Sequence, residues 1–320
     1  MDAAVTTIDL SEPARAAASD GTTVWCAEAR GVRAYTASGT PHGKGDESDT
    51  GGAGREGAAG RGRGAGREDG ARLPELWSLA AVPGTVTGAG VPGMLAETVM
   101  MPRSFAGTSP VHMLRDSLPE GTLAGASRDR VYWLGPSGVP LASVPFEGRV
   151  LAGGGEIWAV GADRACRLAE PGRLHEPVEL PDLDLCAVEG ERLWWTSKRD
   201  TVLRGGPREV DLGRRERGGM AVCAGSLWVS VTGGLLRVSA WSGEPRRFVG
   251  APEGPVPYLA CAHGVLAGGL RDLFTLAPAT GADARLVRLG LQTPLALMIA
   301  AGKHLWAFPA DRPQALIIPL

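Results

Sequence analysis

The chain of 320 residues contains no asparagine at all. This absence excludes N-glycosylation sites, asparagine metal ligands and a Cys–His–Asn catalytic triad. Lysine is nearly as scarce, because it occurs only at positions 44, 198 and 303. The formal net charge is −2, whereas a dedicated binder of nucleic acid or of an anionic membrane needs a clustered positive field. We therefore expect no nucleic-acid partner and no membrane partner.

Long apolar runs and paired cysteines are missing as well. No apolar stretch approaches the length needed to cross a bilayer, and residues 1–21 lack the continuous apolar region of a secretory signal. The five cysteines are an odd number and include no C-x-x-C pair, so a reducing cytoplasm is the simplest compartment. We expect a cytoplasmic protein and a monomer.

Common catalytic motifs are also absent. The sequence has no G-x-S-x-G elbow, no Walker loop and no H-E-x-x-H pair. Residues 52–57 formally match G-x-G-x-x-G, but a dinucleotide site needs that motif between a strand and a helix. Here it lies in low-complexity sequence, which indicates a chance match. These patterns do not identify a cofactor, and they do not indicate a metal site.

The chain is rich in turn-forming residues, and it repeats a short motif that contains a tryptophan. Its 47 glycines and 24 prolines favour many short strands over long helices. Each copy of the repeat has a small-residue turn, a polar residue and an aliphatic–Trp pair that opens a short strand. The copies lie around Trp158, Trp194, Trp228 and Trp306, with Leu266 in the Trp position of a degenerate copy. Their spacing of 34 to 40 residues is the period of a four-stranded propeller blade.

The strand pattern within one period supports this interpretation. Residues 183–190, 192–198, 201–206 and 208–213 read as four successive strands bounded by Gly, Pro or charged residues. The C-terminal residues 295–320 supply three strands of a last blade, and residues 4–10 can supply the fourth. Such pairing closes the ring and leaves no open sheet edge. We predict an all-β fold, a single β-propeller over residues 1–320.

The number of blades is harder to predict. Earlier copies of the repeat lie at Trp25 and Trp133, with a weaker one near Leu95. The step from Trp133 to Trp158 is only 25 residues, so we expect one abbreviated unit. Seven blades is the prediction, and six or eight are the alternatives.

Residues 39–72 do not fit the repeat. They contain almost no apolar side chains, so they cannot bury enough surface to offset the entropy of ordering. We predict a disordered Gly/Arg-rich loop inserted within the first blade. Its six basic residues are matched by six acidic ones, which gives little affinity for nucleic acid.

The segments 155–172 and 225–245 resemble blades of bacterial propeller repeat proteins, namely the YVTN and NHL repeats and the streptogramin-lyase-like group. The resemblance covers about residues 120–320 and implies architecture rather than activity. The lyase-like group is associated with an acid–base His and a Mg²⁺-binding Glu, a pair that the sequence does not place. Gluconolactonase-like propellers use Glu, Asn and Asp around a metal, and this chain has no Asn. The WD-repeat signature is also absent.

The repeated tryptophans and three of the cysteines have structural interpretations. A Trp that recurs at one blade position packs between adjacent sheets, whereas Trp195 and Trp241 break the pattern and are expected on a face. Cys186, Cys223 and Cys261 occupy matching positions late in the first strand of three blades. We expect them to be small buried hydrophobes whose sulfurs stay apart.

The candidate site is the mouth of the central channel. In propellers, the connections between blades and the starts of the innermost strands surround this mouth. They carry candidate catalytic residues Glu147, Asp184 and Tyr258, and candidate ligand-binding residues Arg149, Arg217 and Gln292. Such a set could bind an anionic or polyhydroxylated ligand, and paired carboxylates can acquire separated pKa values suited to acid–base chemistry.

Two functions are compatible with this pattern. The first is an intracellular binding module that presents the polar mouth to a protein or a small-molecule ligand. The second is a propeller enzyme, a lyase, hydrolase or cyclase acting on a specialised metabolite. In that case Glu147 and Asp184 would be acid and base, Arg217 an anion clamp and Tyr258 a hydrogen-bond donor.

Overall fold

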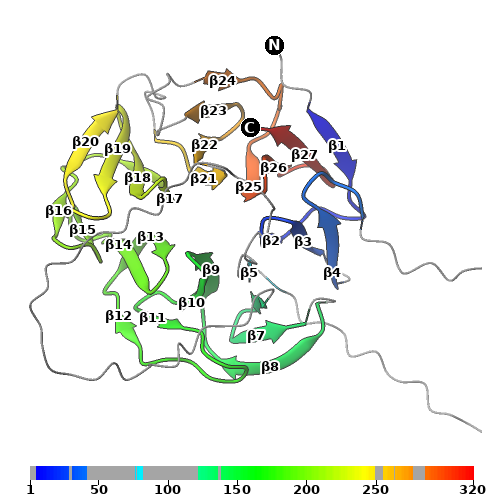
Figure 1. The fold of residues 1–320 in the computed structure, drawn as a ribbon, viewed down its shortest axis with the longest axis horizontal. Coiled ribbons are helices and arrows are strands. Elements are labelled where there is room, and N and C mark those ends of the chain that lie inside the picture. Colours follow the sequence, from blue (N-terminus) through cyan, green and yellow to red (C-terminus); the bar gives the residue numbers. More distant parts are fainter. Residues whose placement is uncertain are drawn as a thin grey trace, which may run out of the picture.

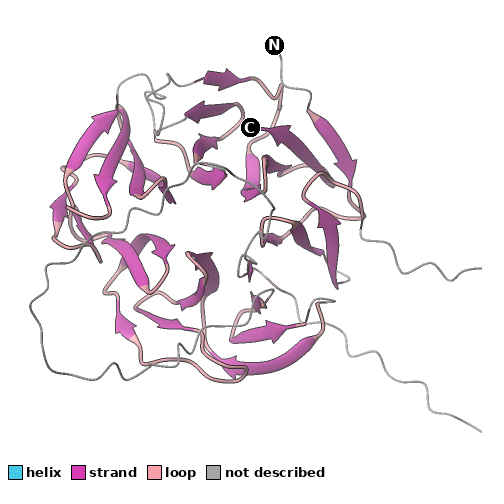
Figure 2. Cartoon of the chain, in the orientation of Figure 1, coloured by secondary structure: helices cyan, strands magenta, loops and turns pink. Residues whose placement is uncertain are grey.

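The structure is a computed structural model that describes residues 5–28, 31–41, 76, 78–81, 122–135, 138–248, 255–262, 264–276 and 285–320. Within these residues the chain forms strands joined by loops, and no helix (Figure 2). Seven antiparallel sheets stand around a common centre (Figure 1). The innermost strands of neighbouring sheets contact one another all the way round the ring. The chain is therefore a seven-bladed β-propeller, as predicted.

The strands of each blade are called a to d from the centre of the ring to its rim. Blade 1 contains β2 (Ala16–Ser19), β3 (Thr23–Glu28) and β4 (Gly31–Thr36). Blade 2 contains β5 (Ser78–Ala81), β6 (Leu123–Ala126), β7 (Arg130–Leu134) and β8 (Pro140–Pro145). Blade 3 contains β9 (Arg149–Gly153), β10 (Glu156–Val160), β11 (Arg164–Arg167) and β12 (Val178–Glu179). Blade 4 contains β13 (Leu183–Glu189), β14 (Arg192–Ser197), β15 (Val202–Arg204) and β16 (Val210–Asp211).

The C-terminal half of the chain continues the pattern. Blade 5 contains β17 (Arg217–Cys223), β18 (Ser226–Val231), β19 (Gly234–Ser239) and β20 (Pro245–Phe248). Blade 6 contains β21 (Tyr258–Ala262), β22 (Val265–Gly269), β23 (Leu273–Leu276) and β24 (Arg285–Val287). Blade 7 contains β25 (Leu295–Ala301), β26 (His304–Pro309), β27 (Gln314–Pro319) and, from the N-terminal segment, β1 (Thr6–Asp9).

The two ends of the chain close the ring in blade 7. Strand β1 pairs antiparallel with β27, with Thr6 opposite Ile317 and Asp9 opposite Gln314. The Gln314 side-chain amide also donates a hydrogen bond to Asp9 at 3.0 Å. This pairing confirms the predicted closure, and it covers the edge that β27 would otherwise expose.

Tryptophans on the second strand of the blades pack between the sheets. Trp158, Trp194, Trp228 and Trp306 are buried, and Leu266 is buried at the same place in blade 6. Two of the indoles also link neighbouring blades, because Trp158 donates to the Gly190 carbonyl and Trp306 to the Ala37 carbonyl. The structural interpretation of this series is confirmed.

Trp133 does not belong to that strand position. It lies on β7, the third strand of blade 2. The second strand of that blade is β6, with the sequence LAGA and no aromatic residue. The short step from Trp133 to Trp158 therefore reflects a change of strand, and the predicted abbreviated unit is wrong.

The prediction for the cysteines is wrong for one pair. Cys223 of β17 and Cys261 of β21 form a disulfide that links blade 5 to blade 6. Both precede the Trp or Leu position of their blades by five residues, whereas Cys186 precedes Trp194 by eight. An offset of three turns a side chain to the other face of a strand, so Cys186 has no equivalent position and remains a free thiol.

Two further expectations concern segments at the margins of the described structure. Of the predicted insertion 39–72, only residues 39–41 are described, directly after β4. The weak repeat near Leu95 lies outside the described residues, in the segment 82–121 between β5 and β6. In the described part of the chain, no helix has the length and apolar character to span a bilayer.

Candidate functional site

A polar cavity of about 1010 Å³ lies on the face where the connections between blades run. We call it the d–a pocket. It lies between blades 2, 3 and 4. Its charged lining residues are Arg128, Glu147, Arg149, Asp163, Arg164, Asp182, Asp184 and Lys198. Three of the six candidate site residues, Glu147, Arg149 and Asp184, are thus brought together in one cavity.

The backbone of two connections brings these side chains close to one another. A Cβ at Gly148 would lie 2.3 Å from the Val160 carbonyl oxygen, so glycine allows the chain to pass close to blade 3 between Glu147 and Arg149. Asp182 has a φ of 52°, which is uncommon for a residue other than glycine. Its carbonyl accepts a hydrogen bond from the Lys198 amide at 2.8 Å, and its carboxylate pairs with Arg199.

The charges of the d–a pocket balance. Four acidic side chains face four basic ones in the lining set given above. The pocket therefore offers both hydrogen-bond acceptors and donors that carry charge, which is the property needed to orient a ligand of mixed charge.

Arg217 lies beside the pocket and fixes Asp184. Its guanidinium pairs with the Asp184 carboxylate at 3.0 Å, and it donates to the carbonyls of Ser197 and Asp200 at 3.0 and 3.1 Å. Arg217 begins β17, so these contacts join blade 5 to blade 4. The Arg217 guanidinium therefore donates its hydrogen bonds within the protein itself, and it fixes the position of the Asp184 side chain.

Arg149 touches a free thiol. Its guanidinium donates to the Cys186 sulfur at 3.4 Å. Burial raises the pKa of the Cys186 thiol, and the nearby Arg149 charge lowers it by less. The thiol is therefore kept protonated at neutral pH and is not an activated nucleophile.

Tyr258 and Gln292 lie elsewhere on the ring. Tyr258 begins β21 in blade 6, and its hydroxyl donates to the Ala296 carbonyl at 2.7 Å. Burial raises the pKa of this phenol, so it remains a donor at neutral pH. Gln292 is exposed in the connection that precedes β25. Neither residue lines the d–a pocket.

The described residues contain no cluster of metal-ligating side chains. Within the described residues, no three His, Cys, Asp or Glu side chains lie in an arrangement that could hold a metal ion.

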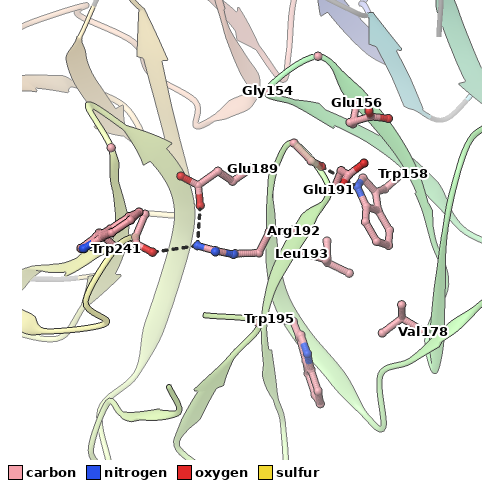
Figure 3. A pocket seen from close by; sticks show the side chains of 15 residues that line it. Gly154, Glu156, Trp158, Val178, Glu189, Glu191, Arg192, Leu193, Trp195 and Trp241 are labelled. Atoms are coloured by element: carbon pink, nitrogen blue, oxygen red, sulfur yellow. Dashed lines mark hydrogen bonds and ion pairs between the residues drawn. The ribbon is translucent and has the colours of Figure 1, made fainter. Parts of the chain in front are cut away.

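A second cavity, of about 1040 Å³, opens on the opposite face at the a–b turns of blades 3, 4 and 5 (Figure 3). We call it the a–b pocket. Sequence reasoning missed it because the lining combines residues from three blades. The signal was present in part, since Trp195 and Trp241 both line it and both were expected on a face.

No family model matches the chain, and no curated protein matches it either. Solved propellers do resemble it in structure. The β-propeller domain of Cps50 (Swd1) from Myceliophteria thermophila has a TM-score of 0.59 at 11% identity, covering 98% of each chain. The WD40 β-propeller domain of Doa1 has a TM-score of 0.58 at 10% identity, covering 98% of this chain and 95% of that one.

A bacterial surface protein gives a similar result. PorZ, a component of the type-IX secretion system of Porphyromonas gingivalis, has a TM-score of 0.57 at 8% identity, covering 99% of this chain and 39% of PorZ. At such low identities the likeness shows the fold alone. It supports the β-propeller fold, whose seven blades follow from the sheet topology.

Proposed function

We propose that the protein is a binding module that presents the d–a pocket to a protein or small-molecule ligand. The observation that carries this proposal is the convergence of Glu147, Arg149 and Asp184 in one cavity of about 1010 Å³. A concave site with a few convergent polar groups is the usual form of a ligand site on a rigid scaffold.

The charge pattern supports a ligand that carries both positive and negative charges. Glu147 and Arg149 are exposed at the rim of the pocket, where they can pair with opposite charges on an incoming ligand. Asp184 is fixed by Arg217 at 3.0 Å and so contributes a positioned acceptor. A peptide segment or a zwitterionic metabolite fits these features.

The enzyme alternative rests on the presence of Glu147 and Asp184 in the same lining. A lyase, hydrolase or cyclase would need one of them as acid and the other as base. The ion pair of Asp184 with Arg217 at 3.0 Å favours binding over this alternative, because it engages the Asp184 carboxylate with a partner inside the protein. The resemblance to YVTN, NHL and lyase-like repeats is compatible with either function.

Native mass spectrometry of the protein, purified gently from its own host, tests the proposal. We expect a retained ligand that is lost from the Glu147→Ala and Arg149→Ala variants but kept by Glu170→Ala. Glu170 is an exposed carboxylate that lies outside the pocket, so it is the matched control. A species retained equally by all the variants would place the ligand elsewhere on the molecule. Turnover of the retained species, abolished by Glu147→Ala, would support the enzyme.

A further inference from the structure

The a–b pocket combines exposed apolar surface with carboxylates. Trp241 stands on one side of it, and Glu191, Trp158 and Val178 stand on the other, with Arg192 between them (Figure 3). Glycines form its turns. A Cβ at Gly154 would lie 2.4 Å from the Gly190 backbone nitrogen, so the turns of blades 3 and 4 pack backbone against backbone. The floor of the pocket is therefore formed by backbone, and side chains stand at its edges.

The apolar part of the pocket is exposed on both sides. Trp241 is 86% exposed and Val178 is 44% exposed. Trp241 is the most exposed of the large hydrophobic residues in the described part of the chain. Exposed aromatic side chains beside a cavity typically mark interaction sites, because they bury large area on binding at low entropic cost.

The charges of the pocket leave an excess of carboxylate. Arg192 donates to the Ala240 carbonyl at 2.8 Å and pairs with Glu189 at 3.5 Å, so its charge is used within the pocket. Arg167 pairs with both Glu156 and Glu191, at 3.8 and 2.6 Å. Glu191 keeps 75% of its side chain exposed and can accept a second cation from outside. Three glutamates thus face two arginines.

The chain itself shows how its tryptophans accept cations. Guanidinium groups lie over the rings of Trp194, Trp195 and Trp228, at 5.0 to 5.7 Å from the ring centroids. Trp241 has no such guanidinium among the described residues. The most exposed indole of the described structure therefore has a face that a guanidinium from outside can reach.

We propose that the a–b pocket binds an arginine-bearing peptide segment of a partner protein. The guanidinium stacks on Trp241, a second basic side chain pairs with Glu191, and an apolar residue packs against Val178. Stacking suits arginine because its planar guanidinium is weakly hydrated and fits an aromatic face. An oligosaccharide could also stack on an indole, but the carboxylate excess favours a cationic partner. This site lies on the opposite face to the d–a pocket and does not depend on it.

Selection from a displayed library of random peptides tests the proposal, with the wild-type protein and two variants as baits. Trp241→Ala removes the stacking surface. Leu141→Ala removes another exposed hydrophobic side chain, 67% exposed on β8 of blade 2 and outside the pocket, and serves as the control. We expect wild-type and Leu141→Ala to enrich peptides rich in arginine, and Trp241→Ala to lose them. Both variants alter exposed residues, so unchanged thermal unfolding verifies that each is folded.

Fluorescence anisotropy with an enriched peptide then gives the affinities. Trp241→Ala should weaken binding at least about tenfold, and Glu191→Gln about threefold at low salt, with the Glu191 effect fading as salt is raised. Replacing the arginines of the peptide with glutamine should abolish binding. The proposal is overturned if no peptide is enriched, if the enriched peptides lack basic residues, or if Trp241→Ala retains them. Binding of an oligosaccharide that requires Trp241, without peptide enrichment, overturns it in favour of a sugar site. Ligand retention at the d–a pocket is read from Glu147→Ala, so the failure of one proposal leaves the other standing.

Discussion

Arg217 bonds to three groups of blade 4, namely the Asp184 carboxylate and the carbonyls of Ser197 and Asp200. Its side chain is 13% exposed and that of Asp184 is 28% exposed, so both charges are partly removed from water. Truncation of one partner leaves the other desolvated and unpaired, which costs more than the pair contributes.

We therefore expect Arg217→Ala to lower the free energy of unfolding by about 2 kcal/mol. Chemical denaturation measures this loss. Arg214→Ala, at an exposed arginine nearby, should change stability by less than about 0.5 kcal/mol. Equal effects of the two variants would show that the contacts of Arg217 contribute nothing beyond those of an ordinary surface arginine.

Cys26 couples the stability of the fold to alkaline pH. Burial, with a smaller effect of the Glu28 charge, raises the pKa of its thiol to about 12. Below the ordinary thiol pKa, both the folded and the unfolded chain hold the proton. As pH rises above that value only the unfolded chain releases it, so stability is lost between about pH 9 and pH 12.

Chemical denaturation at several pH values between 8 and 10 should show this loss, and the slope should be shallower in Cys26→Ala by about 1 kcal/mol per pH unit near pH 10. Burial also raises the pKa of Cys166, Cys186 and Tyr258, so the variant keeps part of the slope. An unchanged slope in Cys26→Ala would mean that its thiolate is tolerated in the folded state.

Some single residues could be placed from the sequence and others could not. The exposure of Trp241 follows from its position outside the repeat, and this expectation is confirmed. The pairing of Cys223 with Cys261 depends on an exact strand register, because Cys186 has nearly the same local sequence but lies three residues out of step. Register between blades is a tertiary property, and local patterns do not report it.

At the scale of elements, β1 is the strand whose loss has the clearest consequence. It supplies the outer strand of blade 7 and covers the edge of β27 through four residue pairs. Removal of residues 1–10 would expose that edge. It would also remove the half-buried Ile8, which packs against the hydrophobic core between blades 1 and 7. An uncovered edge strand is a template for pairing with another chain.

We expect the variant lacking residues 1–10 to unfold at a temperature at least about 5 °C lower and to form soluble aggregates. Thermal unfolding and size-exclusion chromatography measure the two effects. Removal of residues 1–4 alone, which precede β1, is the control and should leave both unchanged. A stable monomer without residues 1–10 would show that ring closure does not need this strand.

The elements of blades 3 to 7 could be predicted because each keeps a glycine turn before an aliphatic–aromatic or aliphatic pair on its second strand. In blade 2 this signal fails for two reasons. Its second strand, β6, has no aromatic residue, and 41 residues separate the end of β5 from the start of β6. The aromatic residue that looked like the repeat signal, Trp133, packs from β7 instead.

At the scale of the whole molecule, the candidate site residues fall on one face of the ring but in different sectors of it. Glu147, Arg149 and Asp184 meet because blades 3 and 4 are neighbours. Tyr258 and Gln292 lie in blade 6 and before blade 7, and a ring carries them to another part of the same face. The sequence order predicts which connections share a face, whereas the reach of side chains across the mouth is set by the three-dimensional structure.

The Cys223–Cys261 disulfide is the one covalent link between side chains of different blades in the described structure, and it bears on the compartment. It closes a segment with a sequence separation of 38 residues, for which loop-closure entropy predicts about 4 kcal/mol of stabilisation. Structural disulfides persist in oxidising environments, so this pair argues against the reducing compartment inferred from the cysteine count.

We expect reduction to lower the free energy of unfolding by about 2–4 kcal/mol, measured by chemical denaturation with and without a reductant. The double variant Cys223→Ala/Cys261→Ala should be equally destabilised and insensitive to reductant, whereas Cys186→Ala should keep the full response. Thiol counting in denaturant gives an independent reading, with three reactive thiols before reduction and five after it. If protein alkylated directly in its host yields five thiols, the pair is reduced there and blades 5 and 6 are held together by packing alone. If it yields three, the disulfide is part of the native ring, and the protein resides in an oxidising compartment.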